Sequence, residues 1–202
     1  MVWNCTFPLW YIADPTGGTA TSSPYWNENW LAQVQGTDDD ALTGALTESS
    51  VGVNVLSLLA FALNTLSIPY GSLEPGQQTD PLVATTTLAA TGNVGIDSDV
   101  LGQSMCTTYT SSTHCPVSAS STIPEDMQVF ATSTVSYALA TPISSTTPAL
   151  IDLNVHKSTA TSSQATNNAF WGIAVPGTIT YAGNYTGENT FTVVLSDPAQ
   201  WY

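Results

Sequence analysis

Hydrophobic and polar residues alternate with a period of two over much of this chain. The pattern is clearest in Ala149–Val155, in Asn189–Leu195 and in the longer run Met127–Ala140. Successive side chains of a β-strand point to opposite faces of a sheet, so this alternation predicts strands with one buried face. Weaker alternation and short apolar runs predict further strands at residues 30–36, 51–55, 81–91, 94–101, 169–175 and 178–181. Residues 58–66 form either another strand or a short buried helix.

Turn-forming residues separate these runs. The chain has 12 Pro and 14 Gly among 202 residues, with turn signals such as Pro176-Gly177 and Gly183-Asn184 between the last strands. A hydrophobic content of 43% is enough for a substantial core. Nine or ten short strands punctuated in this way predict an all-β fold, an Ig-like or jelly-roll β-sandwich over residues 26–202. Residues 1–25 are expected to form an N-terminal arm and linker.

The N-terminal arm has an apolar face of its own. Trp3, Cys5, Phe7, Leu9 and Tyr11 occupy every second position, so an extended chain places all five on one side. Such a strand must lie on its own sheet or enter a neighbouring molecule by strand addition. We expect the second arrangement, in which residues 1–13 are a donor strand at a subunit interface.

The charge balance excludes several partners. The formal net charge is −14, with 15 Asp and Glu residues, one basic residue, Lys157, and no Arg. Binding to nucleic acids or to anionic membranes requires several Lys or Arg residues, so neither is an expected partner. A mostly neutral polar surface suits glycans or packing against copies of the same chain, which indicates an extracellular, cell-surface location. Asn54, Asn64 and Pro69 interrupt the uncharged stretch 49–73, which favours core strands over a membrane span and predicts no membrane insertion of the mature form.

Three cysteines allow one disulfide. Cys106 and Cys115 flank a short polar stretch that is typical of a loop, and a bridge between them is the expected pairing in an oxidising compartment. Cys5 would then be free, buried or paired with another molecule. Three reduced thiols are the alternative.

Few residues show the spacing that chemistry requires. His114 and His156 lack an identifiable catalytic partner, and no phosphate loop or nucleophile elbow is present, so no enzyme activity is expected. No cofactor is expected other than structural calcium, and its candidate ligands are Asp38, Asp39, Asp40, Asp97 and Asp99. The alternative is that these carboxylates form solvated acidic turns.

Asn184 and Asn4 begin acceptor triplets for N-glycosylation. Lys157 is expected to be an ordinary exposed lysine.

The closing stretch, FWGIAVPGTITYAGNYTGENTFTVV, resembles the final strands of secreted prokaryotic surface β-sandwich proteins, including pilin-like, fibre-forming subunits. The matching segments are Pro176-Gly177-Thr178, Gly183-Asn184-Tyr185-Thr186-Gly187 and Thr190–Val194. An earlier stretch, IPYGSLEPG followed by TLAATGNVGID, looks like strand pairs of the same proteins. The resemblance implies a structural subunit of an extracellular filament or surface layer, a homopolymer built by strand exchange. The alternative is a monomeric adhesin or carbohydrate-binding module, in which exposed Trp and Tyr side chains contact glycans.

Overall fold

The computed structural model describes residue 6 and residues 8–118 and 120–201, which are nearly all β. The strands are β1 (Gln33–Val34), β2 (Thr47–Glu48), β3 (Phe61–Leu63), β4 (Ala84–Ala90), β5 (Ile96–Gly102), β6 (Met105–Cys106), β7 (Thr122–Ile123), β8 (Gln128–Ala131), β9 (Thr141–Pro142), β10 (Ala149–Val155), β11 (Thr166–Ile173) and β12 (Asn189–Leu195). Short 3₁₀ helices are η1 (Glu125–Met127), η2 (Tyr137–Leu139) and η3 (Pro198–Gln200). None of the helices in these residues has the length or the apolar character needed to span a bilayer.

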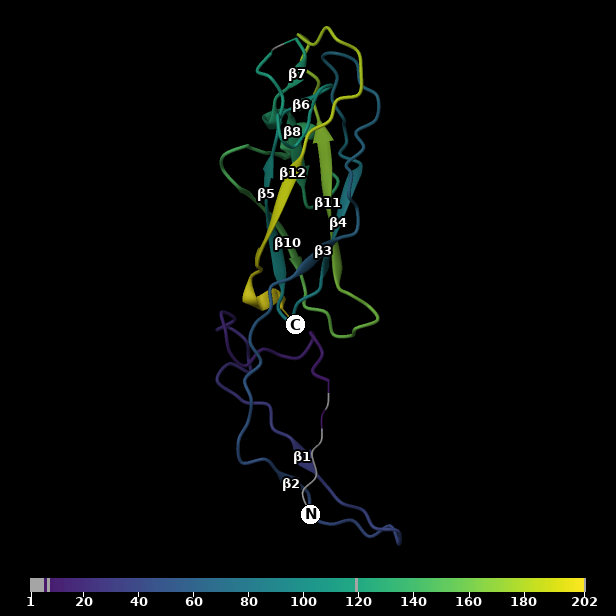
Figure 1. Cartoon of the computed structure of the whole chain (residues 1–202). Coiled ribbons are helices and arrows are strands. Elements are labelled where there is room, and N and C mark those ends of the chain that lie inside the picture. The colour runs from purple at the N-terminus through teal and green to yellow at the C-terminus, as the bar shows by residue number, and fades with distance from the viewer. Residues whose placement is uncertain (1–5, 7, 119, 202) are drawn as a thin grey trace.

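Two antiparallel sheets form the body of the molecule (Figure 1). One has five strands in the order β3-β4-β11-β8-β9, and the other has three in the order β10-β5-β12. They pack as the two layers of a β-sandwich and do not close into a barrel. The expected all-β sandwich class is therefore confirmed.

The core lies between the two sheets. In β10, Ile151, Leu153 and Val155 are buried, whereas the neighbouring Leu150 and Asp152 are exposed, as the alternation predicted. Trp171 of β11 is fully buried, and its indole nitrogen donates a 2.9 Å hydrogen bond to Oγ1 of Thr86. Burial of each large apolar side chain contributes about 1.5–3 kcal/mol, so this layer is the main source of stability.

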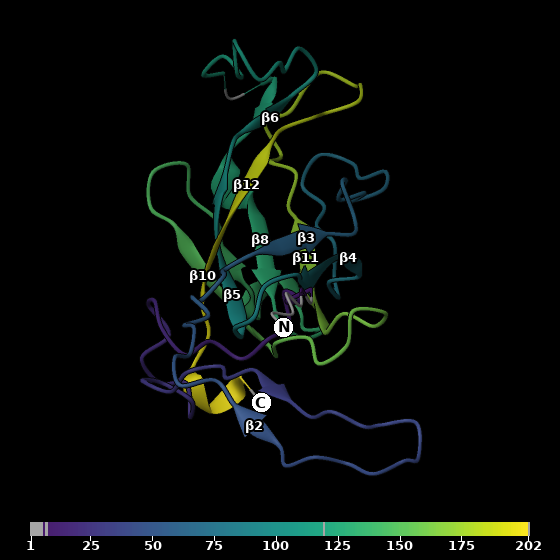
Figure 2. The ribbon, with the colours of Figure 1, turned by 60° about the horizontal axis from the view of Figure 1, so that its bottom comes forward.

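Residues 30–53 form a long hairpin outside both main sheets. Trp30 and Val53 exchange two backbone hydrogen bonds of 3.0 Å, β1 pairs with β2, and the amide of Gly44 donates to the carbonyl oxygen of Gly36. In Figure 1 this hairpin lies at the opposite end of the molecule from β6 and β7, and Figure 2 shows it projecting beyond the sandwich. The first strand of the two main sheets along the chain is β3.

The expected strands are reproduced unevenly. β10 and β12 have the predicted bounds, residues 81–91 contain β4, and residues 94–101 contain all of β5 except its last residue, Gly102. Met127–Ala140 is corrected, because only β8 pairs there and the chain then bends into η2. Thr178 lies in a turn rather than at the start of a strand, since Pro176 lacks an amide hydrogen and Gly177 favours a turn. Residues 58–66 contain a strand, β3, and not a helix.

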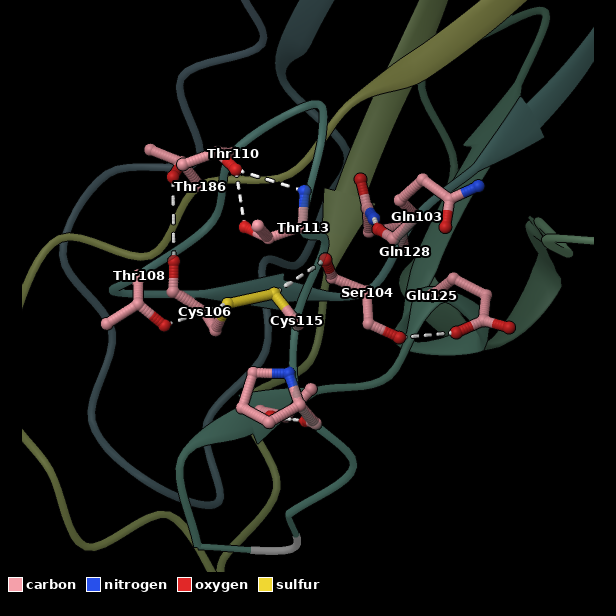
Figure 3. The surroundings of a disulfide bond; sticks show 12 residues. Gln103, Ser104, Cys106, Thr108, Thr110, Thr113, Cys115, Glu125, Gln128 and Thr186 are labelled. Carbon is pink, nitrogen blue, oxygen red and sulfur yellow. Dashed lines mark hydrogen bonds between the residues drawn. A yellow bond between two sulfur atoms is a disulfide. The ribbon is translucent and has the colours of Figure 1, made fainter.

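The end of the sandwich opposite the hairpin contains β6 (Figure 1), which carries a disulfide whose surroundings are drawn in Figure 3. Cys106 and Cys115 are joined, with their Cα atoms 5.7 Å apart, which is the pairing expected from the sequence. The closed loop has internal contacts, because the ring of Tyr109 stacks on that of His114 with 5.9 Å between centroids. Beside it, Glu125 accepts hydrogen bonds of 2.6 Å from the hydroxyl groups of Ser104 and Ser145.

Candidate assembly interface

The N-terminal segment is fastened to the sandwich from Ala13 onward by the turn between β4 and β5. Asn93 in this turn is 3% exposed, and its amide nitrogen donates hydrogen bonds of 3.1 Å to the carbonyl oxygens of Ala13 and Leu56. Its side-chain oxygen accepts a 2.6 Å bond from the backbone amide of Leu58. Gly92 permits this contact, since a Cβ at that position would lie 2.0 Å from the Leu58 oxygen. The buried side chain of Asn93 therefore holds two separate segments, one at Ala13 and one at Leu56 and Leu58.

Lys157 provides the second attachment and corrects the expectation of an exposed lysine. It lies two residues after the end of β10, is 7% exposed, and forms an ion pair with Asp14, which is 29% exposed. Its Nζ also lies 3.5 Å from the carbonyl oxygen of Ile12. Burial lowers the pKa of Lys157 below its ordinary value. The only Lys or Arg of the chain is therefore used internally to hold the N-terminal segment against the sandwich.

The residues that precede this attachment are exposed where the structure describes them. Leu9 and Trp10 are 54% and 59% exposed. Three residues of the expected donor strand, Trp3, Cys5 and Phe7, lie outside the described residues. Tyr11 is half-buried in a turn, in which the amide of Ala13 bonds to the carbonyl oxygen of Trp10. The expected strand over residues 1–13 is therefore corrected, because it does not continue through Tyr11.

The hairpin of residues 30–53 presents a second exposed apolar surface. Its large apolar side chains that are at least 40% exposed are Trp30, Leu31, Val34, Leu42, Leu46, Val51 and Val53. An isolated two-stranded hairpin is marginally stable in water. At its tip, Oδ1 of Asp38 accepts hydrogen bonds from the amides of Asp40 and Leu42, so this carboxylate stabilises the turn. Asp39 and Asp40 lie beside it in the same exposed turn.

The other expected calcium ligands lie in the sandwich, far along the chain from this turn. Asp97 of β5 is 4% exposed and accepts a 2.5 Å hydrogen bond from the amide of Asn154, while Asp99 is half-buried. Burial raises the pKa of Asp97, and the negative charges of Asp152 and Asp197 act in the same direction, against the bond from Asn154. In the part of the chain that the structure describes, no three His, Cys, Asp or Glu side chains converge on a common point as a metal site requires.

The remaining candidate residues lie at the disulfide end or outside the described part. Asn184 is exposed in the loop before β12, which leaves it accessible to glycosylation, and Asn4 lies outside the described residues. Cys106 and Cys115 are consumed by their bond, so neither thiol is available as a nucleophile beside His114.

Comparison with known proteins gave no relative. No protein-family model, curated protein or solved structure matches this chain. The arguments below therefore depend on the geometry of this chain alone. Sequence reasoning missed both attachments of the N-terminal segment. The scarcity of basic residues was a usable signal for Lys157, whereas nothing local marked Asn93.

Proposed function

We propose that this protein is a structural subunit of an extracellular filament or surface layer, whose copies associate when the N-terminal segment of one adds as a strand to the next. The observation that carries the proposal is the exposure of Leu9 and Trp10 immediately before a segment that is firmly attached to the sandwich. An apolar segment that is attached to the sandwich at one end and exposed to solvent beyond that attachment is suited to binding a second molecule.

The composition supports the same function. Charged residues make up 8% of the chain, and the only Lys or Arg is buried at 7% exposure. A surface of this kind presents Ser, Thr and Asn to water and offers no basic site for trypsin-like proteases. Both properties suit a polymer that is exposed outside the cell.

A carbohydrate-binding module is the second candidate, and one cavity favours it. The cavity has a volume of about 350 Å³ beside the start of the hairpin, and its lining includes Tyr25, Glu28, Asn29 and Trp30. The two aromatic rings are 41% and 40% exposed. Exposed rings next to a carboxylate and an amide match what a sugar ring requires, since its CH face stacks and its hydroxyl groups form hydrogen bonds.

The double substitution Phe7→Asp with Leu9→Asp tests the assembly proposal. It places two charges on the apolar face, and loss of two buried side chains at about 1.5–3 kcal/mol each weakens association by about a hundredfold or more. Analytical ultracentrifugation and electron microscopy of the full chain provide the measurement. The matched control is Leu139→Asp, at a side chain 78% exposed on η2, which is expected to assemble as the wild type does.

Two results decide between the candidates. If the wild-type chain stays monomeric, or the double variant still polymerises, the assembly proposal is wrong. A monomer whose oligosaccharide binding is lost on Tyr25→Ala supports the carbohydrate-binding alternative.

A further inference from the structure

A groove runs along one side of the sandwich at the end that carries the disulfide. A cavity of about 320 Å³ lies between the start of β12 and the segment that follows β3, and it is lined by Leu63, Leu66, Ile68 and Phe191 among others. A second cavity of about 370 Å³ shares Ile68, Tyr70 and Met105 with the first. The two cavities are therefore adjacent, and we call them together the β12 groove.

The start of β12, at Asn189 and Phe191, lines this groove, and the strand has a free edge. It is the terminal strand of its sheet and pairs, within the described residues, with β5 alone. Just outside the two ends of β12, the amide of Gln103 donates to the carbonyl oxygen of Glu188, and the amide of Ser196 donates to that of Gly95. Hydrogen-bonded pairs alternate along an antiparallel ladder, so the even-numbered residues of β12 form their backbone hydrogen bonds with β5. The backbone groups of Asn189, Phe191, Val193 and Leu195 alternate with these and point away from β5. An unpaired edge of this kind is a template for another strand.

The core is also less completely covered along this edge than elsewhere. Phe191, Val193 and Leu195 face the core but remain half-buried, whereas the inward side chains of β10 on the far side of β5 are buried. The side-chain oxygen of Asn189 is buried, and no hydrogen-bond partner for it lies in the described part of the chain. A three-stranded sheet opposite a five-stranded one leaves room for a further strand at this edge.

We propose that the β12 groove is the acceptor site for residues 1–9 of a second copy of this chain. This inference depends on the proposed function, and it adds the location of the acceptor. The seven residues of β12 match in length the seven residues from Trp3 to Leu9, about 23 Å at 3.3 Å per residue. The apolar positions of that segment recur every second residue, so one face enters the groove while the backbone bonds to the odd-numbered residues of β12.

The placement of donor and acceptor explains why such an assembly would extend. The N-terminal segment is attached by Lys157 and Asn93, whereas both cavities of the β12 groove are lined by Met105 of β6, a strand at the end of the sandwich opposite the hairpin (Figure 1). Contact between two different surfaces of the chain is head-to-tail and forms an open polymer unless the rotation closes a ring.

Two variants of the full chain disable the acceptor in different ways. Leu66→Lys places a charge at the rim of the groove, where the native side chain is 93% exposed and can be replaced without disturbing the core. Val193→Pro removes a backbone amide that points to the free edge, a position where an edge strand tolerates proline. Each is expected to weaken polymerisation at least tenfold. The matched control Val83→Lys, at a 70% exposed position outside the groove, is expected to assemble normally.

Mixing tests the pairing directly. The Phe7→Asp/Leu9→Asp chain keeps its acceptor and lacks its donor, whereas the Leu66→Lys chain keeps its donor and lacks its acceptor. Neither is expected to polymerise alone, and a 1:1 mixture is expected to give a heterodimer in ultracentrifugation. Its formation is expected to slow hydrogen exchange of the Phe191 and Val193 amides.

The outcomes separate this inference from the proposed function. If Leu66→Lys and Val193→Pro both polymerise as the wild type does while the donor variant fails, the acceptor lies elsewhere and the assembly function stands. Protection of hairpin amides instead of β12 amides in the assembled protein also overturns the acceptor assignment. If the donor variant itself polymerises, the proposed function is overturned.

Discussion

Single residues decide how the N-terminal part of this chain is held. Lys157 is the clearest case, because a buried ammonium group is unfavourable unless a counter-charge and hydrogen-bond acceptors surround it. Asp14 supplies the counter-charge and the Ile12 carbonyl oxygen an acceptor, from a segment more than 140 positions away in sequence. The buried ammonium group is therefore stabilised only while the N-terminal segment stays in this position.

Lys157→Met tests that coupling. Removal of the cation leaves Asp14 unpaired, and because Asp14 is 29% exposed and can recover part of its hydration, we expect a loss of about 2 kcal/mol in the free energy of unfolding. Urea denaturation followed by Trp fluorescence measures it. The double variant Asp14→Asn/Lys157→Met is expected to be more stable than Lys157→Met alone, since no unpaired charge remains. Equal stability of wild type and Lys157→Met would contradict this role.

Asp97 is expected to destabilise the fold at neutral pH. Burial and neighbouring carboxylates raise its pKa in the folded state, so ionisation costs stability at every pH above that value, and the cost disappears as the pH falls below the pKa of the unfolded chain. Asp97→Asn retains an oxygen for the Asn154 amide. We expect a higher melting temperature than the wild type at pH 7 and no difference near pH 3. Asp39→Asn, in the exposed turn, is the control and is expected to leave the melting temperature unchanged at both values.

Structural elements differ in how much of their stability comes from the core. The loop between β6 and β7 lies at one end of the sandwich and buries few apolar side chains, since Val117 is fully exposed and most of residues 107–114 are exposed. Its order depends instead on the disulfide and on polar contacts such as the Tyr109–His114 stack.

Replacing both cysteines, Cys106→Ser with Cys115→Ser, is expected to lower the free energy of unfolding by about 2.5 kcal/mol. The estimate follows from the loop-closure entropy of a loop of about ten residues in the unfolded chain. Denaturation of the oxidised wild type and of the double variant gives the difference. Because the main sheets do not include this loop, the far-UV spectrum is expected to remain that of a β protein. A variant as stable as the wild type would show that polar contacts alone order the loop.

The sequence predicted the strands that show a regular alternation of apolar and polar residues. It missed the segments whose conformation is set by hydrogen bonds to other parts of the chain. β10 and β12 alternate cleanly, so their bounds were predictable; β12 pairs with β5 over its whole length, and β10 pairs with β5 on either side of an irregularity between Ile151 and Val155. The region after β8 alternates as well, yet the carbonyl oxygen of Val135 bonds to Leu82 and the hydroxyl group of Tyr137 bonds to Met127. These long-range bonds, invisible to periodicity, turn the chain into η2. The Asn93 clamp and the β12 groove escaped prediction for the same reason.

At the scale of the whole molecule, the two ends have different properties. One end carries the apolar hairpin, and the other carries β6 and β7 with the disulfide loop between them (Figures 1 and 2). Met105 of β6 lines the β12 groove. A molecule with one kind of surface at each end has a direction, and each added copy is expected to present the same unfilled groove as the copy before it.

The burial of Lys157 has a consequence for how copies approach one another. With its sole fixed cation withdrawn from solvent, the molecule shows water a set of carboxylates and a net charge of −14. Two such particles repel at long range, and the repulsion extends about 30 Å at 0.01 M ionic strength but about 8 Å at 0.15 M. Added sodium chloride is therefore expected to accelerate encounter, the reverse of its effect on pairs of opposite charge, and brackish or saline surroundings would favour growth.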